Sequence, residues 1–270
     1  MIDLSFVILT WNSEKYLSPC LDSLIQQCSK ENISWEIVIV DNGSTDGTQS
    51  IAQRYSGKYT DRIHLIPLKK NHGTTYPRNL GLKMAEGQTC CILDSDTEFN
   101  FGSIRNVINI LLNQRIGMVV PQLLLPGNII QNSVKKFPTF WDKISKIPGI
   151  FLNKKVSSKD FYESFPFYES RPVDTAISAC WFFKKTLLDT VGFLDENIFY
   201  APEDVEYCLR VNKSGLQIVY YPLVSISHHT QQISHQKPFS KVSRSHFIGL
   251  LYYFKKHGGW FRRPTFPHVP

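Results

Sequence analysis

The sequence has no apolar run long enough to cross a membrane. A bilayer crossing takes roughly 20 consecutive apolar residues, and no stretch of the 270 residues approaches that length. The N-terminus also lacks the basic segment and long apolar segment that are typical of a secretion signal. We therefore expect a protein that is neither secreted nor membrane-spanning.

Metal-binding cysteine spacing is also missing. None of the six cysteines forms a Cys-x-x-Cys pair, so we expect neither a zinc site nor a disulfide framework. Cys90 and Cys91 are adjacent in an apolar segment and should face opposite sides of a strand. This cysteine usage fits a reducing cytoplasm. Internal repeats and low-complexity tracts are absent as well.

The composition is that of a globular and basic protein. With 42% hydrophobic residues, the chain can bury the core of one large α/β domain or two small ones. The net charge of +7 indicates an anionic partner, and lysines are dense among aromatic residues between positions 135 and 159. That segment could meet anionic lipid headgroups or a pyrophosphate-linked lipid, or it could be a solvated loop. Nucleic acid is not expected, because no recognised binding motif accompanies the charge.

Short apolar runs alternate with amphipathic segments in the first hundred residues. The pattern predicts strands over 4–9, 35–40, 63–67 and 89–93, and helices over 14–27, 45–55 and 76–86. Such alternation implies an α/β fold with parallel strands, in which ligands gather at the carboxyl ends of the strands.

The second half is less regular. A strand is predicted over 117–125, followed by an irregular segment from 126 to about 172 that we expect to face an acceptor substrate. A strand over 175–183, a short helix from 184, a helix over 201–210 and a strand over 216–221 come next, and an apolar and basic helix covers about 240–256.

Two carboxylates follow the strand predicted at 89–93. Asp94 and Asp96 lie one residue apart, so an extended backbone points both side chains the same way. Two such carboxylates can hold Mg²⁺ or Mn²⁺ and leave positions open for substrate phosphates. The alternative is a polar turn, in which an aspartate caps the backbone.

Five motifs follow one another along the chain. They are FVILTWN at 6–12, VDNGSTDGT at 40–48, NHGTTYPRNLG at 71–81, ILDSDTEF at 92–99 and PEDVEYCLR at 202–210. In this order they resemble the motifs of the family 2 inverting glycosyltransferases, and most closely those of the rhamnosyltransferase-like members that build bacterial surface polysaccharides. The resemblance implies a GT-A fold, with a mostly parallel nucleotide-binding sheet flanked by helices. It further implies one domain over 1–258, made of a nucleotide-sugar-binding half at 1–100, an acceptor-binding and catalytic half at 101–239 and a C-terminal helix at 240–258, before a tail at 259–270.

The resemblance places the nucleotide after the first two strands. It implies that Thr10, Asn12 and Asp41 line the base and ribose. A carboxylate such as Asp41 can accept from the imide N–H of uracil or thymine, and an aromatic neighbour such as Trp11 can stack on the ring. Asp41 could equally be a turn former, because Asp-Asn-Gly-Ser is strong turn chemistry by itself.

The third motif is expected along the donor and its approach to the acidic pair. The resemblance implies this position for Asn71, Gly73, Arg78 and Asn79. The guanidinium of Arg78 could offset diphosphate charge, or it could form a structural salt bridge to Asp94 or another acid.

For the acidic pair, the resemblance implies the D-x-D metal site, with Mn²⁺ or Mg²⁺ as cofactor. Asp94 and Asp96 would be ligands, Asp96 the more direct one, and Ser95 between them would face the nucleotide-sugar. His228 stands where relatives supply a third ligand, and on spacing alone His229 is an equal candidate.

Inversion at the anomeric carbon requires a base for the attacking hydroxyl. The resemblance implies Asp204 as that base, with Glu203 positioning the acceptor or supporting the site. The alternative is structural, because acids in a first helical turn stabilise the helix dipole without catalysis.

The sequence therefore predicts a cytoplasmic, metal-dependent inverting glycosyltransferase, peripheral at the inner face of a membrane. It would move a sugar from a UDP- or TDP-linked donor to a glycan or lipid-linked glycan, and the segments 135–168 and 240–256 would dock it. Because the chain ends soon after residue 260, without an added domain, single addition is expected. The alternatives are a catalytically inactive nucleotide-sugar or glycan-binding module of the same fold, and a nucleotidyltransferase. The second would need a glycine-rich phosphate loop that 10–12 does not offer.

Overall fold

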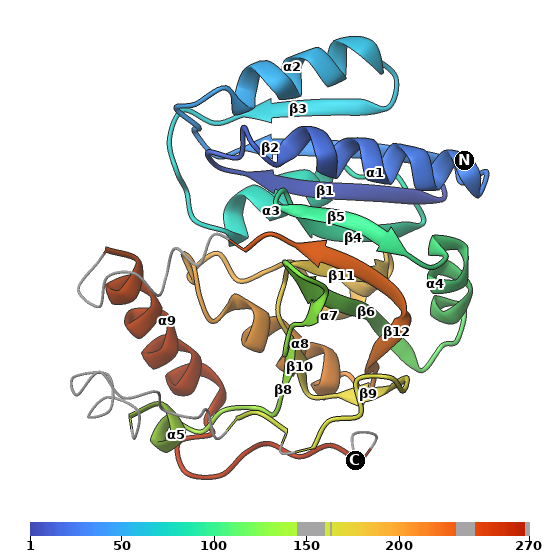
Figure 1. Cartoon of the computed structure of the whole chain (residues 1–270). Helices are drawn as coiled ribbons and strands as arrows, with labels where there is room; N and C mark the ends of the chain where they lie inside the picture. Colours follow the sequence, from blue (N-terminus) through green and yellow to red (C-terminus); the bar gives the residue numbers. More distant parts are fainter. Residues whose placement is uncertain (145–159, 163, 231–240, 268–270) are drawn as a thin grey trace.

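The computed structural model describes residues 1–144, 160–162, 164–230 and 241–267 (Figure 1). Its centre is a mixed sheet with the strand order β3-β2-β1-β4-β11-β6-β12-β5. The first four strands are β1 (Leu4–Thr10), β2 (Trp35–Asp41), β3 (Ile63–Pro67) and β4 (Thr89–Asp94), and they pair in parallel. They are connected by the helices α1 (Leu17–Lys30), α2 (Thr48–Lys58) and α3 (Thr75–Met84). The α/β prediction with a mostly parallel sheet is confirmed.

Strands from the second half enter the same sheet. Strand β11 (Cys180–Lys184) lies antiparallel between β4 and β6 (Ile116–Leu125), and β12 (Gln217–His228) runs parallel to β6 and antiparallel to β5 (Thr97–Phe101). The short strands are β7 (Ile129–Ile130), β8 (Val134–Lys135), β9 (Arg171–Val173) and β10 (Thr175–Ala176). The predicted halves 1–100 and 101–239 therefore share one continuous sheet.

Helices cover both faces of this sheet, so its strands are buried on two sides. One core cluster unites Phe6 and Cys91 with α1, α2 and α4 (Ile104–Leu111). The other unites Val7 and Cys90 with α3, α7 (Leu187–Val191), α8 (Glu203–Lys213) and α9 (Lys241–His257). The prediction that the adjacent cysteines face opposite sides is confirmed. All six cysteines are free and buried.

Several element boundaries differ from the predictions. The helix predicted from residue 14 begins at Leu17, because a turn in which Tyr16 N and Leu17 N both donate to Ser13 O precedes it. The run 175–183 is two strands rather than one, because its two parts pair with different partners. Thr175 and Ala176 pair with β8 in a separate two-stranded sheet, and Ile177 N donates to Ser133 O beside that pairing, whereas β11 pairs with β4 and β6. The strand predicted to stop at 221 continues to residue 228, past a register irregularity.

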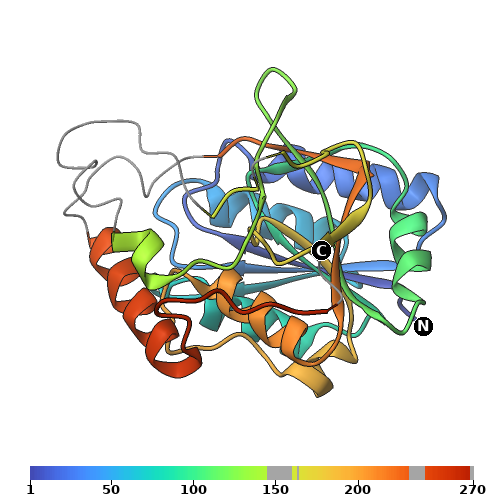
Figure 2. The same ribbon diagram turned by 90° about the horizontal axis from the view of Figure 1, so that it is seen from below.

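One outer edge of the molecule is formed by α9, which lies beside the short α5 (Phe140–Ile144) (Figures 1 and 2). Phe140 packs edge-on against Phe254 of α9, with ring centroids 5.4 Å apart. No helix in the described part of the chain is long and apolar enough to cross a membrane.

Candidate active site

A cavity of about 560 Å³ opens where β1 and β4 end and α8 begins. The described residues that line it include ten of the predicted site residues: Trp11, Asn71, Gly73, Arg78, Asp94, Ser95, Asp96, Glu203, Asp204 and His228. Parallel strands end at this edge of the sheet, and their carboxyl ends are where α/β folds collect ligands. Residues from both halves of the chain therefore line the same cavity.

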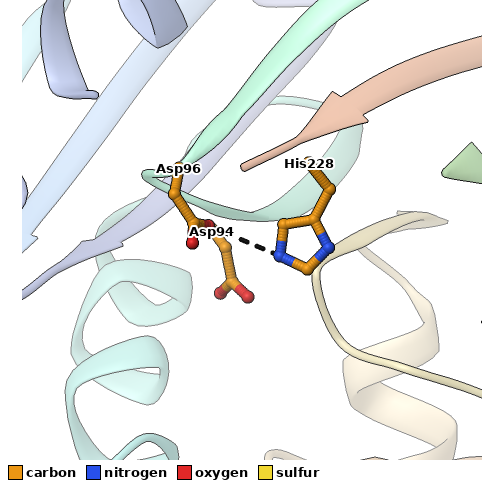
Figure 3. Close-up of side chains that lie close together, drawn as sticks. All are labelled: Asp94, Asp96 and His228. Atoms are coloured by element: carbon orange, nitrogen blue, oxygen red, sulfur yellow. Dashed lines mark ion pairs between the residues drawn. The ribbon is translucent and has the colours of Figure 1, made fainter. Parts of the chain in front are cut away.

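Three of the lining residues lie close together and are possible metal ligands (Figure 3). Asp94 ends β4, Asp96 lies in the turn to β5, and His228 ends β12. One donor atom from each lies within 4.8 Å of the others. The turn is tightened by Thr97, whose hydroxyl donates to Asp94 O over 2.7 Å. The pairing of β12 with β5 sets His228 opposite Thr97 and so carries the imidazole to the carboxylates.

The orientation of His228 suits a metal ligand. Its Nδ1 lies 2.8 Å from Gln131 Oε1, so that nitrogen donates to the amide oxygen. Nε2 then carries a lone pair in the neutral ring, and it lies 3.5 Å from Asp96 Oδ1. Burial alone favours the neutral ring, but the hydrogen bond and charge of Asp96 raise the pKa of His228. The two carboxylates supply the oxygen ligands that Mn²⁺ and Mg²⁺ both prefer, and the imidazole is better suited to Mn²⁺, because Mg²⁺ is bound almost entirely by oxygen.

The structure also distinguishes the two adjacent histidines. His229 points elsewhere: its Nε2 lies 2.7 Å from Glu98 Oε1, and its ring stacks on Tyr16. Successive side chains of an extended backbone face opposite ways, which is why His228 reaches Asp94 and Asp96 and His229 does not.

Arg78 forms the structural salt bridge that was one of its two interpretations. Its side chain is 2% exposed, and its Nη2 donates to Asp94 Oδ1 over 2.6 Å. Its Nη1 donates to Glu203 Oε1 over 3.2 Å and to Ser178 Oγ over 2.9 Å. Arg78 thus joins the acidic pair to the start of α8. Burial and the charge of Asp96 raise the pKa of Asp94, and Arg78 opposes this rise.

The adjacent acids at the start of α8 have different surroundings. Glu203 is 7% exposed, and its burial and the charge of Asp204 raise its pKa to about 7, against the opposing charge of Arg78. Asp204 is less buried and lines the cavity, with its Oδ1 accepting from Val205 N over 2.8 Å. Glu203 is therefore held in a structural network, while Asp204 is open to a substrate.

The residues expected around the base are largely enclosed. Asp41 is 1% exposed and accepts from the hydroxyls of Thr10 and Ser44. Asn12 accepts from Thr45 N over 2.9 Å and bridges two loops. Thr10, Asn12 and Asp41 are not among the described residues that line the cavity, whereas Trp11, 38% exposed, is. Base recognition by Asp41 stays a prediction.

The residues of the third motif have separate roles. Gly73 has a φ of +82°, and an added Cβ would lie 1.9 Å from Phe199 O, so only glycine fits there. Asn71 supports this turn by accepting from Gly73 N over 2.8 Å. The buried amide of Asn79 holds Leu194 N and O at 3.0 and 2.9 Å, and Asn79 is not among the described residues that line the cavity, so its contact with the donor stays a prediction.

Several lining residues were not predicted, among them Asn42, Gln131, Ser178, Phe199 and His246. Asn42 lies inside the second motif, so its Asp-Asn-Gly context could have indicated it. Gln131 follows the end of β7, Ser178 lies in the break between β10 and β11, Phe199 precedes α8 and His246 lies on α9. No local pattern marks these positions.

Comparisons with known proteins agree with this geometry. A family model described as glycosyl transferase family 2 matches residues 5–192. An N-acetylglucosaminyl-diphospho-decaprenol L-rhamnosyltransferase of Mycobacterium tuberculosis is 25% identical over 97% of this chain and 87% of its own length.

Two solved structures show the same fold. GalNAc-T7 with UDP, GalNAc and Mn²⁺ has a TM-score of 0.71 at 14% identity, over 94% of this chain and 48% of that one. The mannosyltransferase PcManGT of Pyrobaculum calidifontis, with GDP-Man and Mn²⁺, has a TM-score of 0.60 at 18% identity, over 97% of this chain and 65% of that one. The chain thus spans about half to two thirds of these longer proteins. Both carry Mn²⁺, and their nucleotides differ.

Proposed function

The chain belongs to glycosyl transferase family 2, and from that premise we propose that it is an inverting, metal-dependent glycosyltransferase that uses a nucleotide-diphospho-sugar. The observation that carries the proposal is one cavity that holds both a cluster of metal-binding side chains and a separate open carboxylate. Asp94, Asp96 and His228 form the cluster, and Asp204 is the carboxylate.

We assign the cluster to the diphosphate of the donor. Asp94, Asp96 and His228 would hold Mn²⁺ or Mg²⁺, which when bound neutralises charge on the departing nucleoside diphosphate. Arg78 keeps Asp94 in place through its 2.6 Å contact rather than binding phosphate. Asp41 and Trp11 are the proposed base contacts. Because a carboxylate accepts from the imide of uracil or thymine, we propose UDP or TDP.

We assign the proton transfer to Asp204. Direct inversion needs a carboxylate on the acceptor side that takes the hydroxyl proton as the new bond forms. Both acids line the cavity, but the carboxylate of Glu203 is bound by Arg78 and Ser178, whereas that of Asp204 is more open. Glu203 is then the residue that orients the start of α8.

For the acceptor we propose a lipid-linked glycan in surface polysaccharide synthesis, at the cytoplasmic face of a membrane. The support is the name of the mycobacterial relative, in which the acceptor is a sugar on a diphospho-polyprenol, together with the net charge of +7. The basic and aromatic segment 135–168 was predicted to take part. Much of it, including Lys154 and Lys155, lies outside the described residues.

The test is thermal stability with UDP, TDP, GDP and CMP, each with and without Mn²⁺. A ligand that binds only the folded state raises the unfolding midpoint. At a ligand concentration of a hundred times Kd, it adds about 2.7 kcal/mol to the free energy of unfolding. We expect a Mn²⁺-dependent rise with UDP or TDP. Turnover is then measured as nucleotide release, with Asp204→Asn as the inactive control.

The outcomes separate the competing functions. If only GDP raised the unfolding midpoint, the proposal that Asp41 recognises uracil or thymine would be wrong. Nucleotide binding without turnover by the wild type would indicate the inactive nucleotide-sugar-binding module. No rise with any nucleotide would leave a glycan-binding module as the better account.

A further inference from the structure

The outward face of α9 carries an apolar stripe that the catalytic proposal does not use. Phe247, Ile248 and Leu251 are 50%, 55% and 36% exposed. Exposed Arg244 and Lys255 precede and follow them. These five positions are spaced by three, one, three and four residues, so they form one strip along the helix. Exposure of such a strip to water is unfavourable, because burying apolar surface lowers the free energy.

The opposite face of α9 is fixed to the rest of the protein. Tyr253 and Phe254 are 1% and 0% exposed. Gly249 approaches the backbone so closely that an added Cβ would lie 2.1 Å from Ala201 O, in the loop that leads into α8. The outer stripe is therefore presented by a helix that cannot turn it inward.

The same helix borders the active-site cavity. His246, next to Phe247, lines the cavity together with Asp204. In Figures 1 and 2, α9 lies at the outer edge of the molecule, on the same side of the sheet as α8. A surface that docks on α9 would thus lie beside the cavity.

We propose that this face of α9 docks on the surface of an anionic phospholipid bilayer and so holds the cavity next to a lipid-linked acceptor. The choice of partner rests on the proposed function, because such an acceptor reaches an enzyme only from the membrane surface. Apolar side chains enter the interface between headgroups and acyl chains, and the flanking cations meet anionic lipid. The sequence of α9 contains no aspartate or glutamate to oppose this attraction.

Charge argues against a second copy of the chain as the occupant. In a symmetric antiparallel pairing of two α9 stripes, Arg244 of one helix would face Lys255 of the other. Like charges in contact oppose association. An anionic surface satisfies both ends of the stripe at once.

The test is flotation with vesicles of phosphatidylcholine, with and without about one third phosphatidylglycerol. The variant is Phe247→Ser with Ile248→Ser. Leu223→Ser is the matched control, because Leu223 is a 59% exposed leucine on β12 rather than on α9. We expect the wild type and the control to bind anionic vesicles, and the double variant to partition roughly tenfold less. Raising salt should weaken wild-type binding, because salt screens the attraction.

Three results would overturn the proposal: no wild-type binding to anionic vesicles, undiminished binding by the double variant, or a wild-type dimer that the double variant dissociates. Folding of each variant is checked by its thermal midpoint. The UDP and Mn²⁺ dependence of that midpoint needs no membrane. A normal nucleotide response without vesicle binding therefore refutes only the docking, whereas vesicle binding without a nucleotide response refutes only the proposed enzyme.

Discussion

A cluster of ionic contacts outside the cavity centres on Glu206, and replacement of Glu206 by glutamine should destabilise the protein in a pH-dependent way. Glu206 lies on α8, is 0% exposed, and its Oε1 accepts from Lys256 Nζ and His257 Nε2, each over 2.9 Å. Arg210 Nη2 lies 2.9 Å from the other oxygen. These contacts fasten the helix that carries Asp204 to the end of α9.

The size of the effect follows from the pKa. Burial by itself raises the pKa of Glu206, but the hydrogen bonds from His257, Arg210 and Lys256 outweigh it and lower the pKa to about 2, from an ordinary 4.5. Each tenfold change in the ionisation equilibrium is about 1.4 kcal/mol, so the ionised carboxylate contributes about 3 kcal/mol to the free energy of unfolding. Its side chain is 1% exposed, so solvent screening reduces this little.

The direction of the pKa shift sets the pH range over which the stabilisation by Glu206 is lost. Because the pKa is lower in the folded state, the stabilisation is fully present above pH 4.5. It is lost as the pH falls from about 4.5 towards 2, where the folded protein takes up the proton. Glutamine resembles the protonated acid in shape. The difference between the wild type and Glu206→Gln should therefore be about 3 kcal/mol at pH 7 and should shrink below pH 4.5.

The assay is urea unfolding of both proteins at pH 7, 4.5 and 3.5, followed by tryptophan fluorescence. Asp61→Asn is the control, because it removes one carboxylate that is exposed. It should change the free energy of unfolding by less than about 0.5 kcal/mol. A difference for Glu206→Gln below about 1 kcal/mol at pH 7, or one that stays constant down to pH 3.5, would refute this account of the network.

Three further predictions concern the cavity. Asp204→Asn should lower kcat roughly a thousandfold while the midpoint rise with UDP and Mn²⁺ is kept; an unchanged kcat would exclude it as the base. Gln131→Leu frees His228 Nδ1 and should weaken Mn²⁺ binding roughly tenfold in titration calorimetry, whereas Gln131→Glu should keep it; equal Kd values would remove the orienting role. Arg78→Lys cannot span Asp94, Glu203 and Ser178 at once and should cost about 2 kcal/mol in urea unfolding; a loss below about 0.5 kcal/mol would contradict the bridge.

The first half of the fold could be predicted because its signals are local. Strands buried on both faces appear as unbroken apolar runs, and the polar residues that follow them mark the ends where ligands collect. The acidic pair was placed correctly at the end of β4 for this reason. In the second half, β12 runs through Pro222, a residue that normally ends a strand. Pairing with β6 resumes only at Ser225, so its full length depended on distant partners.

The remaining parts of the site depended on tertiary contacts. The sequence could not choose between His228 and His229, because only the register with β5 decides which imidazole faces Asp96. The two interpretations of Arg78 could not be separated either, since Glu203 and Asp94 are far apart in the chain. No local sequence pattern indicates Gln131, because its contact with His228 depends on where β12 ends.

The pairing of β12 with β5 has a consequence for how the protein is made. Asp94 and Asp96 leave the ribosome long before His228, which lies about 130 residues later in the sequence. At about 5–20 residues per second, the interval is roughly 6 to 26 seconds. During that time the nascent chain displays two carboxylates at the edge of an incomplete sheet, because β11, β6 and β12 have not all taken their places between β4 and β5. The cluster of three possible metal ligands is thus among the last features of the described sheet to form, and tight metal capture, if the cluster binds a metal, would mark a chain whose synthesis has passed β12.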